Sequence, residues 1–237
     1  MEPYRWLEAV RHRREYIEDQ INEATPVFAA SRPEGILLLA VGLGQSKVFE
    51  VFDRHGMAAL GNPVDIEKLR HTAIEAAHLE SFNRSPDDVS LRRLINYALS
   101  TALKNSFEQI YSPPLMVDSV FAEVGRTHEE DSICRLNYDG DFELQRDGFA
   151  IVSPNKQAAF QARGWVEENL KDDDDVDRVI RVFLTAWQAM VKTIRFEDTL
   201  EIINKIDDLD LDGKVIEAAM LDRNGDARVK FRMLEVG

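Results

Sequence analysis

The stretch Ser46–Gly61, SKVFEVFDRHGMAALG, constrains the fold of this chain more than any other. It contains two short apolar runs on either side of Asp53-Arg54-His55-Gly56, a segment rich in residues that reverse a chain. The first run alternates, so that Phe52 is expected on the same face as Val48. The stretch therefore predicts a β-hairpin.

The hairpin belongs to a longer series of strands and helices. Turn residues Ser31–Gly35 separate two earlier apolar runs, and Asn62-Pro63 follows the hairpin as the expected start of a helix. In chain order we expect a helix at Pro3–Glu23; strands at Pro26–Ala30, Ile36–Val41, Val48–Phe52 and Met57–Leu60; helices at Val64–Ser81 and Pro86–Tyr111; strands at Met116–Val124, Ser132–Tyr138, Phe142–Gln145 and Phe149–Val152; helices from Ser153 to about Leu170 and at Val176–Lys192; a short helix at Thr199–Ile206; and strands at Lys214–Leu221 and Ala227–Leu234. Strand groups that alternate with helix pairs predict the α+β class, as a four-layer αββα sandwich of two antiparallel sheets flanked by helices.

Composition sets the outer limits. The chain has 237 residues, of which 44% are hydrophobic, and nothing in it resembles an interdomain linker, so we expect a single domain over residues 1–237. It contains neither an apolar run long enough to span a membrane nor a signal peptide. The single cysteine, Cys134, excludes an internal disulfide framework and favours a cytoplasmic location.

The chain is acidic, with a formal charge of −14, which argues against general nucleic-acid binding. A local basic patch nevertheless occupies the first fourteen residues, at Arg5 and Arg11–Arg14, while acidic runs lie near residues 172–175 and 207–212. These clusters are either solvated surface or complementary surfaces through which neighbouring subunits meet.

Four segments carry a family resemblance. They are AVRHRRE at residues 9–15, EGILLLA at 34–40, the stretch Lys47–Gly61, and YDG at 138–140. Together with the element order, they make nearly the whole chain resemble a proteasome subunit of the N-terminal-nucleophile hydrolase fold, and specifically the α-type subunit of bacterial proteasomes. The resemblance implies an N-terminal helix within residues 1–24 and a sandwich over residues 25–237.

Proteolytic members of this family use an N-terminal threonine whose own amine acts as the base, with an acid and a lysine nearby. Thr25 is the one candidate nucleophile here, because it directly precedes the first expected strand, and Lys47 matches the family's catalytic lysine. The acid is missing, since Ala40-Val41-Gly42 stands in its place. Thr25 is also followed by proline and is not preceded by the family's glycine-ending cleavage site. We therefore expect no catalytic residue, with self-processing at Thr25 as the alternative.

In α-type subunits the matching lysine lies in a pocket between neighbouring subunits, so the resemblance implies that Lys47 receives the C-terminal carboxylate of an activating ring ATPase. The alternative is an ordinary lysine at the edge of a strand. Only Met1-Glu2 precede Pro3, where family members carry a tail that closes the axial pore. We therefore expect a pore that is open or closed by something else.

The resemblance implies a non-catalytic subunit in a seven-membered outer ring, stacked on a β-type protease ring, which admits unfolded proteins and docks an activator. A homo-oligomeric scaffold of the same fold is a further alternative. Glu67, His71, Glu75 and His78 share one expected helix but lack further convergent ligands, so we expect no metal and no cofactor.

Overall fold

The structure is a computed structural model, and it describes residues 3–171, 174–193, 199–206, 208–225 and 229–236. The short segment Met1-Glu2, part of the acidic runs and the start of the last expected strand lie outside the described residues. The helices are α1 (Pro3–Ile21), α2 (Pro63–Asn83), α3 (Leu91–Leu94), α4 (Ser100–Glu108), α5 (Lys156–Asn169), α6 (Val176–Lys192) and α7 (Thr199–Ile203). The strands are β1 (Val27–Arg32), β2 (Gly35–Gly42), β3 (Val48–Phe52), β4 (His55–Gly61), β5 (Val117–Glu123), β6 (Ser132–Leu136), β7 (Phe142–Leu144), β8 (Phe149–Val152), β9 (Val215–Asp222) and β10 (Phe231–Leu234).

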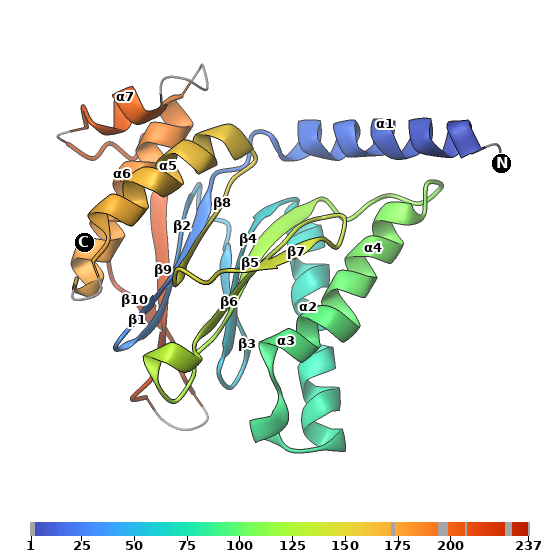
Figure 1. Ribbon diagram of the computed structural model, residues 1–237, viewed down its shortest axis with the longest axis horizontal. Coiled ribbons are helices and arrows are strands. Elements are labelled where there is room, and N and C mark those ends of the chain that lie inside the picture. Colours follow the sequence, from blue (N-terminus) through green and yellow to red (C-terminus); the bar gives the residue numbers. More distant parts are fainter. Residues whose placement is uncertain (1–2, 172–173, 194–198, 207, 226–228, 237) are drawn as a thin grey trace.

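The strands form two antiparallel five-stranded sheets, in the orders β10-β9-β2-β1-β8 and β3-β4-β5-β6-β7. Helices α5, α6 and α7 lie outside the first sheet, and α2, α3 and α4 lie outside the second (Figure 1). The predicted four-layer αββα sandwich is confirmed.

Three hydrophobic cores fill the spaces between these layers. Strand β2 shows how the sequence divides them: Leu37 and Leu39 belong to the core under α5 and α6, whereas Ile36 and Leu38 point into the core between the sheets. A strand that is apolar on both faces suits a sheet covered on both sides. The third core lies between the second sheet and α2–α4.

Polar residues start several of the covering helices. Asn62 accepts a hydrogen bond from the amide of Val64 at 2.9 Å, as predicted for the start of α2. Asn155 and Asp175 make the same kind of contact at the starts of α5 and α6.

The helix predicted over Pro86–Tyr111 is divided into shorter pieces, so that prediction was wrong in its continuity. A 3-10 turn at Pro86–Asp88 is followed by Ser90 in an extended conformation, and α3 begins only at Leu91. A π-helical turn at Ile95–Leu99 then leads into α4. Buried side chains recur there at every fourth position, at residues 95, 99, 103 and 107, and a wider turn keeps this spacing on one face.

The predicted hairpin is present, but its turn is tighter than expected, because His55 and Gly56 already belong to β4. The pairing of β3 with β4 shifts between Glu50 and Phe52. Phe52 consequently packs on the third core, whereas Val48 faces the core between the sheets. The expectation that both lie on one face was wrong because a bulge inserts a residue into the alternation.

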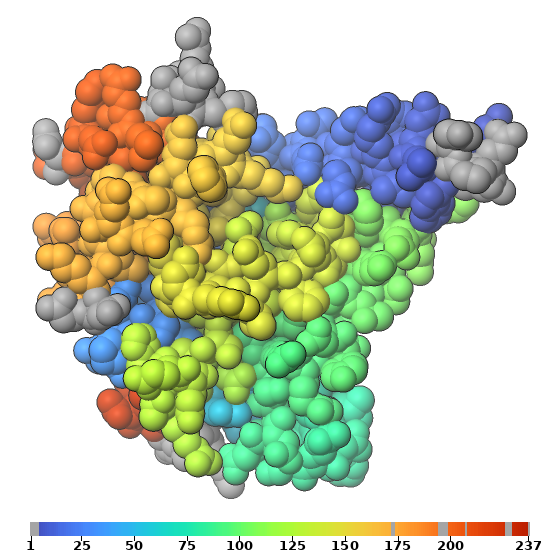
Figure 2. Space-filling view, in the orientation of Figure 1, coloured from blue at the N-terminus to red at the C-terminus, as the bar shows by residue number. Residues whose placement is uncertain are grey.

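Helix α1 runs across one end of the sandwich and projects beyond it (Figures 1 and 2). Ile17 and Ile21 are buried in the core between the sheets. Arg13 donates to the carbonyls of Ser106 and Ser112, each at 2.8 Å, near the end of α4. Arg14 pairs with Asp139 at 3.0 Å. Two residues of the predicted basic patch, Arg13 and Arg14, therefore fix α1 to the body.

Candidate functional site

Three segments that are distant in sequence meet at one end of the sandwich. Thr25 lies between α1 and β1, Lys47 directly precedes β3, and Glu217 lies in β9, opposite Ala40 of β2. The fold brings together Thr25 and Lys47, the two residues selected from the sequence, and adds Glu217.

The Lys47 side chain contacts Thr25 directly. Its Nζ lies 2.6 Å from Thr25 Oγ1 and 3.4 Å from the carbonyl oxygen of Thr25, and it donates to both. The Thr25 hydroxyl in turn donates to the carbonyl of Val41. Since the hydroxyl proton points at a carbonyl and the lysine is a donor, the lysine does not act as a base toward the hydroxyl in this arrangement.

Glu217 organises the main chain around Lys47. Its carboxylate accepts hydrogen bonds from the amides of Lys47, at 2.7 Å, and Val48, at 3.2 Å. These bonds hold the start of β3, in one sheet, against β9, in the other sheet. The sequence analysis missed this residue, although one acidic side chain inside the apolar run VIEAAML was a usable signal.

Burial lowers the pKa of Lys47 to about 8, and the charge of Glu217 opposes this shift. A lysine with this pKa is mostly protonated at pH 7, so the site presents an ammonium group. A protonated, partly buried lysine is suited to bind a carboxylate.

The place of the missing acid is apolar in the structure as well. Ala40 and Val41 are both buried at the end of β2. The amine of Thr25 is joined to Ala24 in the chain that continues from α1, so it is not free to accept a proton. The described site therefore contains a hydroxyl, an ammonium group and a carboxylate that binds main-chain amides, but not the set of groups that activates an N-terminal threonine.

A shallow hollow of about 230 Å³ adjoins this site. The loop that joins β2 to β3 forms one wall and the first residues of β9 form another, with Gly42, Gly44, Ser46, Val215 and Met233 among its lining residues. Leu43, in the same loop, is 84% exposed. A polar anchor thus lies next to an exposed apolar side chain.

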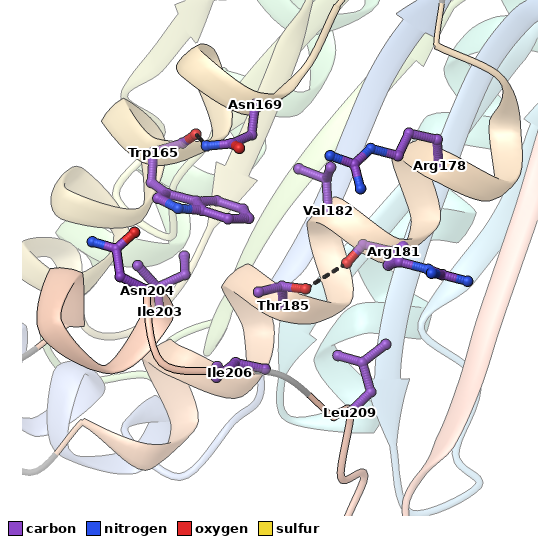
Figure 3. Close-up of a pocket in the computed structure, with 10 residues that line it drawn as sticks. All are labelled: Trp165, Asn169, Arg178, Arg181, Val182, Thr185, Ile203, Asn204, Ile206 and Leu209. Carbon is purple, nitrogen blue, oxygen red and sulfur yellow. Dashed lines mark hydrogen bonds between the residues drawn. The ribbon is translucent and has the colours of Figure 1, made fainter.

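A second hollow, of about 350 Å³, opens between α5, α6 and α7 (Figure 3). The indole of Trp165 reaches from α5 toward Val182, and Arg178 and Arg181 lie on the opposite side. Its polar side chains bond within their own helices: Thr185 donates to the carbonyl of Arg181, and Asn169 and Asn204 donate to the carbonyls four residues earlier. These lining residues provide no acid and base pair for chemistry.

The α2 residues considered as metal ligands do not converge. Glu67 contacts Arg70 at 3.0 Å and His71 at 3.9 Å, and His78 meets the ring of Phe52 edge-on. Within the described ranges, no three or more His, Cys, Asp or Glu side chains lie close enough to hold a metal ion. In the same part of the chain, no helix is both long enough and apolar enough to cross a membrane.

Comparison with known proteins gives one consistent family. The family model described as "Proteasome subunit" matches residues 25–200. The proteasome subunit alpha of Jonesia denitrificans is 29% identical over 236 residues, which cover 94% of this chain and 89% of that protein. The proteasome subunit alpha of Streptomyces coelicolor is 26% identical over 232 residues, or 97% of this chain and 84% of that protein.

A more similar but shorter match is to the proteasome subunit alpha of Actinosynnema mirum, with 36% identity over 133 residues. It covers 55% of this chain and half of the length of that protein. The family match begins at Thr25, which lies in the connection between α1 and β1. The resemblance to bacterial α-type subunits is confirmed, and the chain belongs to the proteasome subunit family.

Proposed function

We propose that this chain is a non-catalytic α-type subunit of a bacterial proteasome, which forms an outer ring on a ring of separate β-type subunits. The observation that carries the proposal is the connection from α1 through Thr25 into β1. Ile17 and Ile21 fix the last turns of α1 between the sheets. Thr25, in the place of the nucleophile, follows α1 in the chain, so its nitrogen is part of a peptide bond and is not a free amine. The names of the relatives agree with this role.

In this role the chain acts as one domain over residues 1–237, with α1 followed by a sandwich over residues 25–237. The ring has seven members, lies in the cytoplasm and admits unfolded proteins to the protease chamber. α1 and the outer helices α2–α4 supply its contacts with neighbouring α-type subunits and with the β-type ring. Their exposed apolar side chains, among them Leu7 and Phe82, support this assignment.

Lys47 docks an activator in this proposal, by pairing with the C-terminal carboxylate of a ring ATPase. The protonated ammonium, the adjoining hollow and the exposed Leu43 support the assignment. The alternative, a strand-edge lysine with only a local role, predicts that Lys47→Ala leaves activator-stimulated degradation unchanged. We expect Lys47→Ala to abolish stimulation while basal peptidase activity and ring assembly remain.

The main test is co-expression of this chain with the β-type gene of the same organism, followed by native mass spectrometry and a peptidase assay. We expect peptidase activity only from the mixed complex. Replacing the N-terminal threonine of the β-type partner should abolish it, whereas Thr25→Ala should not.

Activity from this chain alone, lost in Thr25→Ala and accompanied by a mass lacking residues 1–24, would instead identify a self-processed peptidase. The names of the relatives do not favour that alternative. A closed homo-oligomer that fails to bind the β-type partner would support the scaffold alternative.

A further inference from the structure

Of the two groups that accept a hydrogen bond from the Lys47 ammonium, the hydroxyl of Thr25 is the nearer. Nζ and Oγ1 are 2.6 Å apart, whereas the second acceptor, the Thr25 carbonyl, is 3.4 Å from Nζ. The hydroxyl donates its hydrogen bond to the carbonyl of Val41, so a lone pair of its oxygen is free to accept from the ammonium. One side chain therefore links the end of β2 to the lysine that precedes β3.

The charged surroundings of Lys47 are sparse. Glu217, from β9, is the charged group that acts on it in the described structure, and its carboxylate bonds the main-chain amides of Lys47 and Val48. On the side of β1 the neighbour is the neutral Thr25, and on the side of β2 it is Gly42, which lies against the lysine stem. Main-chain bonds thus fix the backbone of Lys47, while Thr25 is the side chain that holds its amine.

We propose that Thr25 is a positioning residue that holds the Lys47 ammonium in place for an incoming terminal carboxylate. This inference rests on the proposed docking role of Lys47. A lysine stem has many rotamers, so a donor that is already held in place loses less freedom when a ligand binds. The threonine in the place of the family's nucleophile therefore serves recognition in this chain, through its hydroxyl oxygen.

The first test follows the titration of Lys47 in the intact ring by NMR of ¹³C-labelled lysine, with Lys47→Arg to assign the signal. Because burial lowers the pKa of Lys47 to about 8, we expect the wild-type amine to titrate near that pH. Thr25→Val keeps the shape of the side chain but removes the acceptor. We expect the ammonium to swing into water, so that its pKa rises toward the ordinary value of 10.5. Thr25→Ser restores the hydroxyl and should return the pKa to about 8.

Glu217→Gln provides a contrast, because it removes the charge near Lys47 while the Thr25 hydroxyl stays in place as the acceptor for Nζ. The glutamine has one acceptor oxygen, so it keeps one of the two bonds that the carboxylate accepts from the amides of Lys47 and Val48. Since Glu217 raises the pKa of Lys47, this variant should lower it. The two neighbours are thus expected to move the same titration in opposite directions. A Lys47 pKa that stays near 8 or falls in Thr25→Val would show that the lysine keeps its place without the hydroxyl, and would overturn the proposal.

The second test measures binding of the tripeptide Ala-Leu-Leu to the ring at pH 7, as a free acid and as its C-terminal amide. We expect the acid to bind more tightly than the amide, Lys47→Ala to remove that preference, and Thr25→Val to weaken acid binding about three- to tenfold. Thr25→Ser should bind like the wild type. If Lys47→Ala leaves acid binding unchanged, the docking role fails; if only Thr25→Val leaves it unchanged, the positioning role alone fails.

Discussion

At the scale of single residues, the side chain of Arg223 connects several segments that are distant in sequence. It pairs with Asp131 through two contacts of 2.8 Å, and the two side chains are only 9% and 3% exposed. The same guanidinium also donates to the carbonyls of Arg32, Pro33, Gly125 and Thr127. One guanidinium thus joins the turn between β1 and β2, the loop before β6 and the end of β9.

Removing this guanidinium leaves the buried carboxylate of Asp131 without its charged partner. We expect Arg223→Ala to lower the free energy of unfolding by about 3–5 kcal/mol, the range for breaking a buried ion pair. Urea unfolding followed by tryptophan fluorescence measures the change. Lys104→Ala, which breaks an exposed pair with Glu108, is the matched control and should change stability by less than about 1 kcal/mol. Equal effects of the two variants would contradict the role given to Arg223.

Asp118 makes stability depend on pH. Burial raises the pKa of this carboxyl to about 6, although the amide of Tyr138, which donates to it at 2.9 Å, works in the other direction. Because the folded state holds the proton more tightly than the unfolded state, the contribution of Asp118 is fully present below about pH 4 and is lost as the pH rises through 6.

We therefore expect the stability of Asp118→Asn, relative to the wild type, to rise by about 2.5 kcal/mol between pH 4 and pH 7. Urea unfolding of both proteins at intervals of one pH unit measures this difference and cancels the titration of other groups. Parallel stability curves would show that Asp118 titrates at the same pH in both states.

At the scale of elements, α1 depends on a few contacts, since most of its surface faces away from the body. Arg13 supplies two of them by bonding the carbonyls of Ser106 and Ser112. We expect Arg13→Ala to destabilise the protein by about 2–3 kcal/mol and to speed amide hydrogen exchange throughout α1. Arg11→Ala, which loses only an exposed pair with Glu15, should leave exchange in α1 unchanged. Faster exchange in both variants would mean that helix charge, not the bonds of Arg13, determines the order of α1.

The elements also show what a sequence can and cannot predict. Apolar periodicity and turn residues were sufficient for the sheets and the covering helices, because each strand group and each helix pair carries its own local pattern. The break before Leu91 could not be predicted locally, since the amide of Leu91 bonds Glu123 of β5, a residue far along the chain. The bond between the amide of Lys47 and the carboxylate of Glu217 could not be predicted for the same reason, because the two residues are 170 positions apart. The contact between Thr25 and Lys47 was within reach because the family resemblance had already selected both residues.

At the scale of the whole molecule, the two outer helical layers, α2–α4 and α5–α7, both expose aromatic side chains. Phe82 on α2 is 88% exposed, next to the exposed Leu79 one turn earlier, and Phe160 on α5 is 80% exposed. These layers lie on opposite faces of the sandwich (Figure 1). If only one of them meets the β-type ring, equivalent substitutions on the two faces must have unequal effects on assembly.

We expect Phe82→Ser to reduce the yield of mixed α–β complex at least about tenfold, because a large aromatic side chain at the centre of an interface commonly contributes 2 kcal/mol or more. The matched variant Phe160→Ser should assemble normally, and both should fold, since neither ring is buried in the isolated chain. Native mass spectrometry of each variant co-expressed with the β-type partner measures the yield, with circular dichroism of the α-type chain as the check on folding. The reverse result, in which Phe160→Ser alone prevents assembly, would place the β-type ring against α5 and α6 and leave the α2 face for the outside of the particle. The same complex can also be assayed for activator-stimulated degradation. Stimulation that depends on Lys47 would show that the end of the sandwich that carries Thr25 and Lys47 remains accessible to an activator once the rings have joined.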